Sequence, residues 1–275
     1  MSIDKSDYEE SCCCFNAAMY TGTPDSAPCP DTIDIKSVVA SFDALLNSDK
    51  ESEAGKHLDF WCSEAAKIGD WRSELTLQSE LMGYHRRTND KNSAFNAVNR
   101  GLELISEHHL GSTVSGATVL LNAATTMKAY GETEKSLPIF THVSRIFSAN
   151  LAPTDYRFAG LFNNMALSYS DCGMLEAAEQ YFLKALAVIK YCESPENELA
   201  VTCCNLAELY GKMGREDKVE QMLDDAYTYL TSPALPHNSY YAFNVSKCLP
   251  TFEYFGFFIY ARELKARLNE YYERS

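Results

Sequence analysis

One two-helix pattern recurs along this 275-residue chain at an interval of 41 or 42 residues. Asn163–Leu186 aligns with Cys204–Tyr227, so that Gly173 of one copy meets Gly214 of the next. Six copies are present, and they start near the following residues: Ile35, Leu75, Ala117, Ala159, Ala200 and Ala242. A repeat of this length predicts a stacked array of similar units rather than one globular core.

The copy that starts at Ala159 shows why its helices must pair. Apolar side chains recur at three- and four-residue steps, which places them on one stripe of each helix. The first helix carries Leu161, Phe162, Met165, Ala166 and Tyr169, and the second carries Ala178, Tyr181, Phe182, Ala185, Leu186 and Ile189. Gly173 lies between them and supplies the positive φ that ends the first helix. Neither helix can bury its stripe alone, so the units are predicted to stack.

The two ends of the array depart from the pattern. In the second copy Asn89 replaces the turn glycine, and in the first copy Asp49 does so. The last copy is predicted to cap the array, with Lys265 in place of the expected aromatic. Residues 1–33 do not repeat and are rich in acidic residues and proline. We therefore predict a flexible or loosely docked acidic arm over 1–33 and a single repeat domain over 34–275.

Charge and hydropathy exclude several partners. The net charge is −14, whereas phosphate binding needs a dense Lys/Arg surface, so nucleic acid is not the expected partner. The same charge disfavours anionic lipid. The longest apolar run, Tyr254–Ala261, is far shorter than the roughly 20 residues of a membrane span, and the acidic N-terminus does not resemble a signal peptide. A cytoplasmic protein with no membrane partner is expected.

Catalytic and metal-binding motifs are missing from the sequence. The ten cysteines include no C-x-x-C, so most of them are expected to be small buried thiols, and no metal site is predicted. The triplet Cys12–Cys14 is the one cluster that could be exposed and reactive. No phosphate-binding loop, H-E-x-x-H or G-x-S-x-G occurs. The chain is therefore predicted to have no enzymatic activity and no cofactor.

The repeat resembles a known family. Its pattern L/M-A-x-x-Y, then Gly, then A-x-x-x-F-x-x-A, is similar to the tetratricopeptide repeat, and the similarity is strongest over Ala117–Leu230. The interval exceeds that family's usual period of about 34 residues, as in the elongated repeats of its kinesin-light-chain-like subclass. HEAT-type repeats would also fit the interval, but the turn glycine and its flanking residues favour the first family. The resemblance implies an all-α fold, a right-handed superhelical solenoid of about six antiparallel helix pairs.

The same resemblance implies a binding site, because the family's first helices line a concave groove. Matching positions give nine ligand-binding candidates: Asn122, Asn163, Asn164, Asn205, Lys128, Lys212, Arg86, Arg87 and Lys247. Asparagines about 10 Å apart on successive helices offer donors and acceptors to the backbone of an extended peptide. Two alternatives stay open. The asparagines could instead cap or buttress a neighbouring helix, and the pair Arg86 and Arg87 could simply be solvated.

Three functional hypotheses follow. The first is a non-enzymatic module that binds a peptide or protein segment in the groove. The second is a structural scaffold or self-associating assembly factor, a monomer or weak homodimer, that uses aromatic side chains of Tyr240–Val245 and Tyr254–Tyr260; these could equally belong to the core. The third is a peptide-sensing regulator without its own DNA-binding domain, since residues 1–33 are too short and too acidic to form one.

Overall fold

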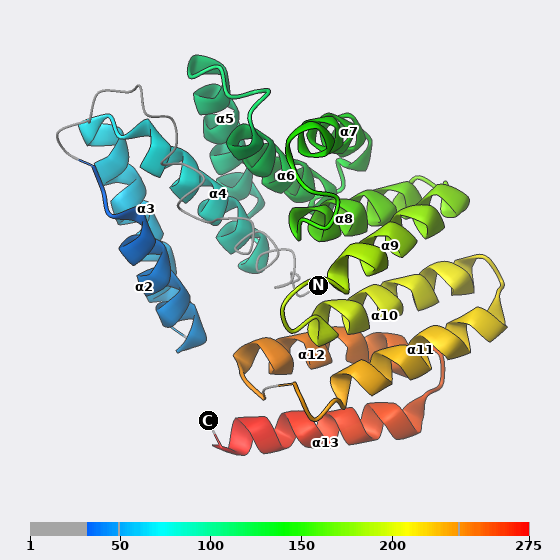
Figure 1. Ribbon diagram of the computed structural model, residues 1–275. Helices are drawn as coiled ribbons and strands as arrows, with labels where there is room; N and C mark the ends of the chain where they lie inside the picture. Colours follow the sequence, from blue (N-terminus) through cyan, green and yellow to red (C-terminus); the bar gives the residue numbers. More distant parts are fainter. Residues whose placement is uncertain (1–31, 49, 236, 275) are drawn as a thin grey trace. The chain divides into compact units, whose positions relative to one another are not determined.

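A computed structural model describes residues 32–48, 50–235 and 237–274 and shows helices joined by short connections (Figure 1). In chain order these helices are α2 (Ile35–Asn47), α3 (Glu51–Ile68), α4 (Trp71–Arg87), α5 (Lys91–Glu107), α6 (Val114–Ala129), α7 (Thr133–Asn150), α8 (Arg157–Asp171), α9 (Leu175–Ile189), α10 (Glu196–Lys212), α11 (Glu216–Leu230), α12 (Ser239–Tyr254) and α13 (Phe258–Arg274). The described residues include no strand, and consecutive helices pack in pairs from α2 with α3 to α12 with α13. The predicted all-α array of six helix pairs is confirmed.

The contacts divide the chain into two compact parts, one that ends at Leu151 and one that begins at Ala152. The N-terminal part contains the hairpins α2–α3, α4–α5 and α6–α7, and the C-terminal part contains α8–α9, α10–α11 and α12–α13. Within each part first helices pack on one another, as α4 does on α6 and α10 does on α12. Residues about one repeat apart therefore lie on neighbouring helices.

The turns inside the hairpins follow the sequence prediction. Gly173 and Gly214 adopt φ angles of 76° and 67°, the left-handed region that glycine enters without steric cost. Asn89 takes a φ of 57° at the matching turn, so it does replace the glycine of the other copies. Asparagine tolerates this region better than most residues because its short amide bonds locally. Asp49 lies outside the described residues.

The core of each hairpin is built from the small and large residues of the repeat. In α8–α9 the alanines Ala166, Ala178 and Ala185 are fully buried, which lets the two helices approach closely. Phe182 is buried beside them. Tyr169 is only half-buried and stacks on Tyr181, with ring centroids 5.2 Å apart. The predicted stripes thus face the packed side of each helix, and their aromatic edge reaches the surface.

From α4 onward the first helices begin two to four residues before the starts counted from the sequence, and polar residues cap α4, α6 and α12. Asp70 and Thr113 accept hydrogen bonds from the third backbone N–H of α4 and α6, and Asn238 does the same for α12. Such caps satisfy amides that have no partner within the helix. Asp70 also accepts from the backbone N–H of Ile33 at 3.1 Å, which ties the residue before Asp34 and α2 to α4. The rest of the predicted arm, residues 1–31, lies outside the described residues.

The described cysteines are all free thiols. Cys62, Cys203, Cys204 and Cys248 are buried, as predicted, whereas Cys172 is exposed. The triplet Cys12–Cys14 lies outside the described residues. Over the described ranges, no cluster of three or more His, Cys, Asp or Glu residues could hold a metal ion. None of the described helices is long and apolar enough to cross a membrane.

Asp43 on α2 is a partly buried carboxyl whose effect on stability should depend on pH. Burial raises the pKa of its carboxyl from 3.8 to about 6. A carboxyl whose pKa is higher in the folded state favours folding while it is protonated, and this contribution is lost as the pH rises from about 4 to about 6. Asp43→Asn should therefore stabilise the chain near neutral pH by about 1 kcal/mol, after allowance for solvent screening, and give little gain near pH 4.

Urea unfolding of the full chain at both pH values measures this difference. Asp59 is an exposed carboxylate on α3, and Asp59→Asn is the matched control that should not reproduce the gain at neutral pH. A loss of stability in Asp43→Asn at neutral pH would show that the carboxylate is better solvated in the folded chain than its burial implies.

Candidate protein-binding surface

Polar side chains of consecutive first helices hydrogen-bond to each other, and we call each such bond a rung. In the N-terminal part, the Nδ2 of Asn122 donates to the Oγ of Ser79 at 2.6 Å, and the Nη1 of Arg86 donates to the Oγ1 of Thr126 at 2.8 Å. The same Nη1 lies 3.4 Å from the backbone carbonyl oxygen of Asn122. All four side chains are buried, and Arg86 is 0% exposed. These rungs hold α4 against α6 and leave no solvated guanidinium at Arg86.

The neighbouring Arg87 points elsewhere, because consecutive helical residues lie about 100° apart around the axis. Its Nε donates to Glu51 Oε1 of α3 at 2.6 Å, and its side chain is only 12% exposed. Lys128 is half-exposed on α6. Of the three predicted cations in this part, Arg86 and Arg87 therefore join helices, and Lys128 retains access to solvent.

In the C-terminal part, two rungs join α8 to α10. The Nδ2 of Asn205 donates to the Oδ1 of Asn163 at 3.1 Å, and the Nζ of Lys212 donates to the Oγ of Ser170 at 3.0 Å. Asn163 and Ser170 are buried, whereas Asn205 is half-exposed and Lys212 is exposed. Seven residues separate the two donors, so they lie on the same side of α10. That side presents an amide and an ammonium group to solvent.

Asn164 takes no part in a rung. Its Nδ2 donates to the carbonyl of Gly160 in its own helix at 3.1 Å, and its buried Oδ1 has no hydrogen-bond partner among the described residues. Asn244 on α12 behaves alike, with its Nδ2 donating to the carbonyl of Tyr240 and its Oδ1 unpartnered among those residues. Both side chains are at most 3% exposed, so Asn164 is a core amide as the chain stands.

Two further rungs, which the sequence did not predict, join α10 to α12. Tyr240 donates from its hydroxyl to Glu198 Oε1 at 2.7 Å, and Thr251 donates from its hydroxyl to Glu208 Oε1 at 2.7 Å. Burial raises the pKa of Glu198, and the hydrogen bond from Tyr240 opposes that rise. Within each rung the residues are 42 or 43 apart. Searching for polar pairs at the repeat interval, rather than for asparagine alone, would have found them.

The nine predicted residues thus differ in how far their side chains are exposed to solvent. Asn163 and Asn205 contact each other directly, and Arg86 reaches the backbone of Asn122. The buttressing alternative is confirmed for the amides that form rungs, and the solvated alternative is wrong for Arg86. Five predicted residues are not buried, namely Arg87, Lys128, Asn205, Lys212 and Lys247, and of these Arg87 is held in an ion pair with Glu51. Ligand binding by any of the nine stays a prediction.

A comparison with known protein families finds a match for part of the repeat region. Residues 157–232, which span α8 to α11, match the family model described as "Tetratricopeptide repeat". No curated protein matches the chain. The matched segment covers the two hairpins whose sequences align best with each other.

Three solved structures are similar to the chain in fold. A putative kinesin light chain of Podosopora anserina with nearly identical TPR-like repeats is 16% identical, with a TM-score of 0.53 over 73% of this chain and 95% of that one. A glutamine-to-methionine variant of that protein is also 16% identical, with a TM-score of 0.54 over 73% of this chain and 97% of that one. BtubC (BKLC) from P. vanneervenii is 18% identical, with a TM-score of 0.53 over 76% of this chain and 97% of that one. Residues 157–232 therefore match the tetratricopeptide repeat, and the chain shares its fold with solved proteins built from TPR-like repeats.

Proposed function

We propose that the chain is a non-enzymatic interaction module that binds a segment of a partner protein along α8, α10 and α12. Stacked helical repeats form extended surfaces that serve for protein–protein interaction. The observation that carries the proposal is the exposed side of α10, where Asn205 and Lys212 each form a rung and still face solvent. A side chain that is already fixed loses little conformational entropy when a ligand binds.

The chemistry of that side selects the kind of ligand. Asn205 uses its Nδ2 in the rung, which leaves its Oδ1 to accept a backbone N–H from an extended segment. Glu208, exposed three residues further along α10, adds carboxylate oxygens that accept as well. Lys212 supplies a positive charge in a chain of net charge −14. The ligand we propose is an extended segment that offers main-chain N–H groups and carries a carboxylate near Lys212.

The Asn163–Asn205 rung offers a matched pair of variants. Peptides selected on the full chain from a random library would first supply a fluorescent probe. Asn205→Ala should then weaken binding of that probe at least about tenfold, because it removes the exposed amide. Asn163→Ala breaks the same rung from its buried side and keeps Asn205, so its affinity should stay within about threefold of the unaltered chain.

Each of these variants should cost about 1 kcal/mol of unfolding free energy, since each loses one hydrogen bond. Fluorescence anisotropy measures the binding and circular dichroism checks the helicity. Equal affinity in Asn205→Ala and the unaltered chain would remove this surface as the binding site. A library that yields no peptide would count against binding of an extended segment at all.

A further inference from the structure

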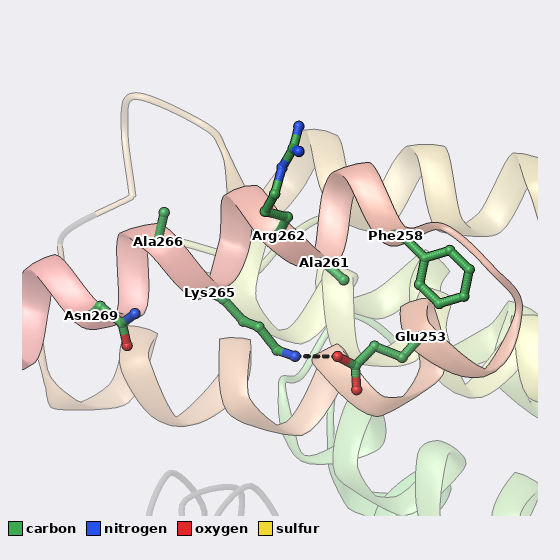
Figure 2. Close-up of a pocket in the computed structure, with 7 residues that line it drawn as sticks. All are labelled: Glu253, Phe258, Ala261, Arg262, Lys265, Ala266 and Asn269. Carbon is green, nitrogen blue, oxygen red and sulfur yellow. Dashed lines mark hydrogen bonds and ion pairs between the residues drawn. The ribbon is translucent and has the colours of Figure 1, made fainter.

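The outer side of α13, the last helix of the C-terminal part, is open to solvent (Figure 1). Beside it lies a shallow hollow of about 500 Å³. The lining residues are Glu253, Phe258, Ala261, Arg262, Lys265, Ala266 and Asn269. Figure 2 shows Lys265 turned toward Glu253, with which it forms an ion pair, whereas Arg262 and Ala266 point together away from that pair.

The position of Lys265 distinguishes α13 from the second helices before it. The matching residues are Phe182 in α9 and Leu223 in α11, which are 1% and 0% exposed. Lys265 instead has a side chain that is 52% exposed. Where the earlier repeats bury a large apolar residue, α13 thus keeps a hydrated cation at its surface.

Large apolar side chains nevertheless gather around α13. Nine exposed large hydrophobic residues occur in the described part of the chain, and four of them lie between Tyr254 and Tyr272. Tyr254 is 82% exposed, Phe258 67%, Ile259 71% and Tyr272 60%. Three of the four, Tyr254, Phe258 and Ile259, lie within six residues of chain where α13 begins, and neighbouring exposed apolar side chains mark a surface that a partner can cover.

The charges along α13 indicate which partner fits. Its exposed stripe runs Ile259, Arg262, Ala266, Glu270 and Glu273. Glu263 borders the stripe in the first half, but it is already bonded to Arg267 and to the hydroxyl of Tyr227, so Arg262 is the remaining charge of that half. Arg262 forms no hydrogen bond or ion pair with any described residue. A second α13 laid antiparallel would place each basic half against an acidic half, twice over by symmetry. An unrelated acidic helix would match only the first half of the stripe.

The small residue at the centre of α13 also favours an antiparallel pair of these helices. Ala266 is the midpoint of Phe258–Arg274, so it would lie on the two-fold axis, where a methyl group lets two helices approach closely. We propose that this stripe of α13 is the contact between two copies of the chain. In this dimer Arg262 faces Glu270 of the second copy, and Ile259 lies against the methylene groups of Glu273 of the second copy.

Light scattering of the full chain across a dilution series tests the proposal. The unaltered chain should pass from dimer to monomer as it is diluted. Ala266→Arg places two large cations on the axis and should leave only monomer, although the folded chain has room for the side chain. Ala66, an exposed alanine on α3, provides the control Ala66→Arg, which should dimerise like the unaltered chain.

Charge reversal tests the pairing itself. Arg262→Glu or Glu270→Arg alone should raise the dimer Kd at least about tenfold, because like charges then face each other. The combination of both changes in one chain restores opposite charges and should return the Kd to within about threefold of its original value. A chain that is monomeric at every concentration, or a dimer that survives Ala266→Arg, would overturn the proposal. Neither outcome bears on peptide binding at α10.

Discussion

A Gly116→Ala variant should lose more than about 3 kcal/mol of unfolding free energy, the upper range for overpacking a site that cannot relax. Gly116 is buried in the first turn of α6. A Cβ built on it would lie 2.1 Å from the backbone oxygen of Leu110 and 2.8 Å from the carbonyl carbon of that residue. Both atoms belong to the backbone, so no side-chain rotation can relieve the clash.

Leu110 cannot move away without cost, because it holds the connection between α5 and α6. Its N–H donates to the carbonyl of Ile105, and its oxygen accepts from both the backbone N–H and the hydroxyl of Thr113. The same hydroxyl caps α6 by accepting from the Gly116 N–H at 3.0 Å. A methyl group at Gly116 would therefore displace the cap and the turn together.

The matched control is Gly111→Ala, in the same connection. No atom lies within 4 Å of a Cβ built on Gly111, so this variant should change the unfolding free energy by less than about 1 kcal/mol. Urea unfolding followed by circular dichroism compares the two variants directly. Equal stabilities would mean that the α5–α6 connection shifts freely, and the close approach of Gly116 to Leu110 would then have no energetic consequence.

The hairpins could be predicted from the sequence because their cause is local. The periodic stripes, the turn glycines and Asn89 each act within one repeat, so their consequences are visible in a single stretch of sequence. The starts of α4 and α6 were displaced because their polar caps, Asp70 and Thr113, precede the first periodic residue. The close approach at Gly116 depends on a neighbouring carbonyl, and no pattern of residue types reports such a distance.

The candidate residues lie on the first helices of the repeats, as the sequence predicted, but the solvent exposure of their side chains was not predictable. Residues one repeat apart lie on neighbouring first helices, and polar side chains placed there bond to each other before they bond to a ligand, as Asn163 and Asn205 do. The direction in which a side chain points around the helix axis then determines whether it is buried, and this direction differs between adjacent residues. Arg86 turns toward α6 and is buried, whereas Arg87 turns toward α3. A repeat alignment assigns the position but not this angle.

Arg86→Met should cost about 3 kcal/mol of unfolding free energy, since hydrogen bonds to a buried charged group are worth about 1.5–3 kcal/mol and the change removes those that the Nη1 of Arg86 donates to Thr126 and to Asn122. Methionine retains most of the length of the side chain, so the loss reports the hydrogen bonds rather than a large cavity. The Oγ1 of Thr126 loses its donor, whereas the carbonyl of Asn122 still accepts from the Thr126 hydroxyl at 2.8 Å. Arg145 is an exposed arginine on α7, and Arg145→Met should change stability by less than about 0.5 kcal/mol.

A double-mutant cycle with Thr126→Val separates the rung from other contacts of Arg86. Valine has nearly the shape of threonine but no hydroxyl, so it removes the 2.8 Å bond from the acceptor side. If the rung stabilises the chain, the two changes together should cost about 1–2 kcal/mol less than the sum of the single changes. Additive losses would show that the guanidinium acts through its remaining contacts. The rungs would then be a consequence of stacking between first helices rather than a cause of it.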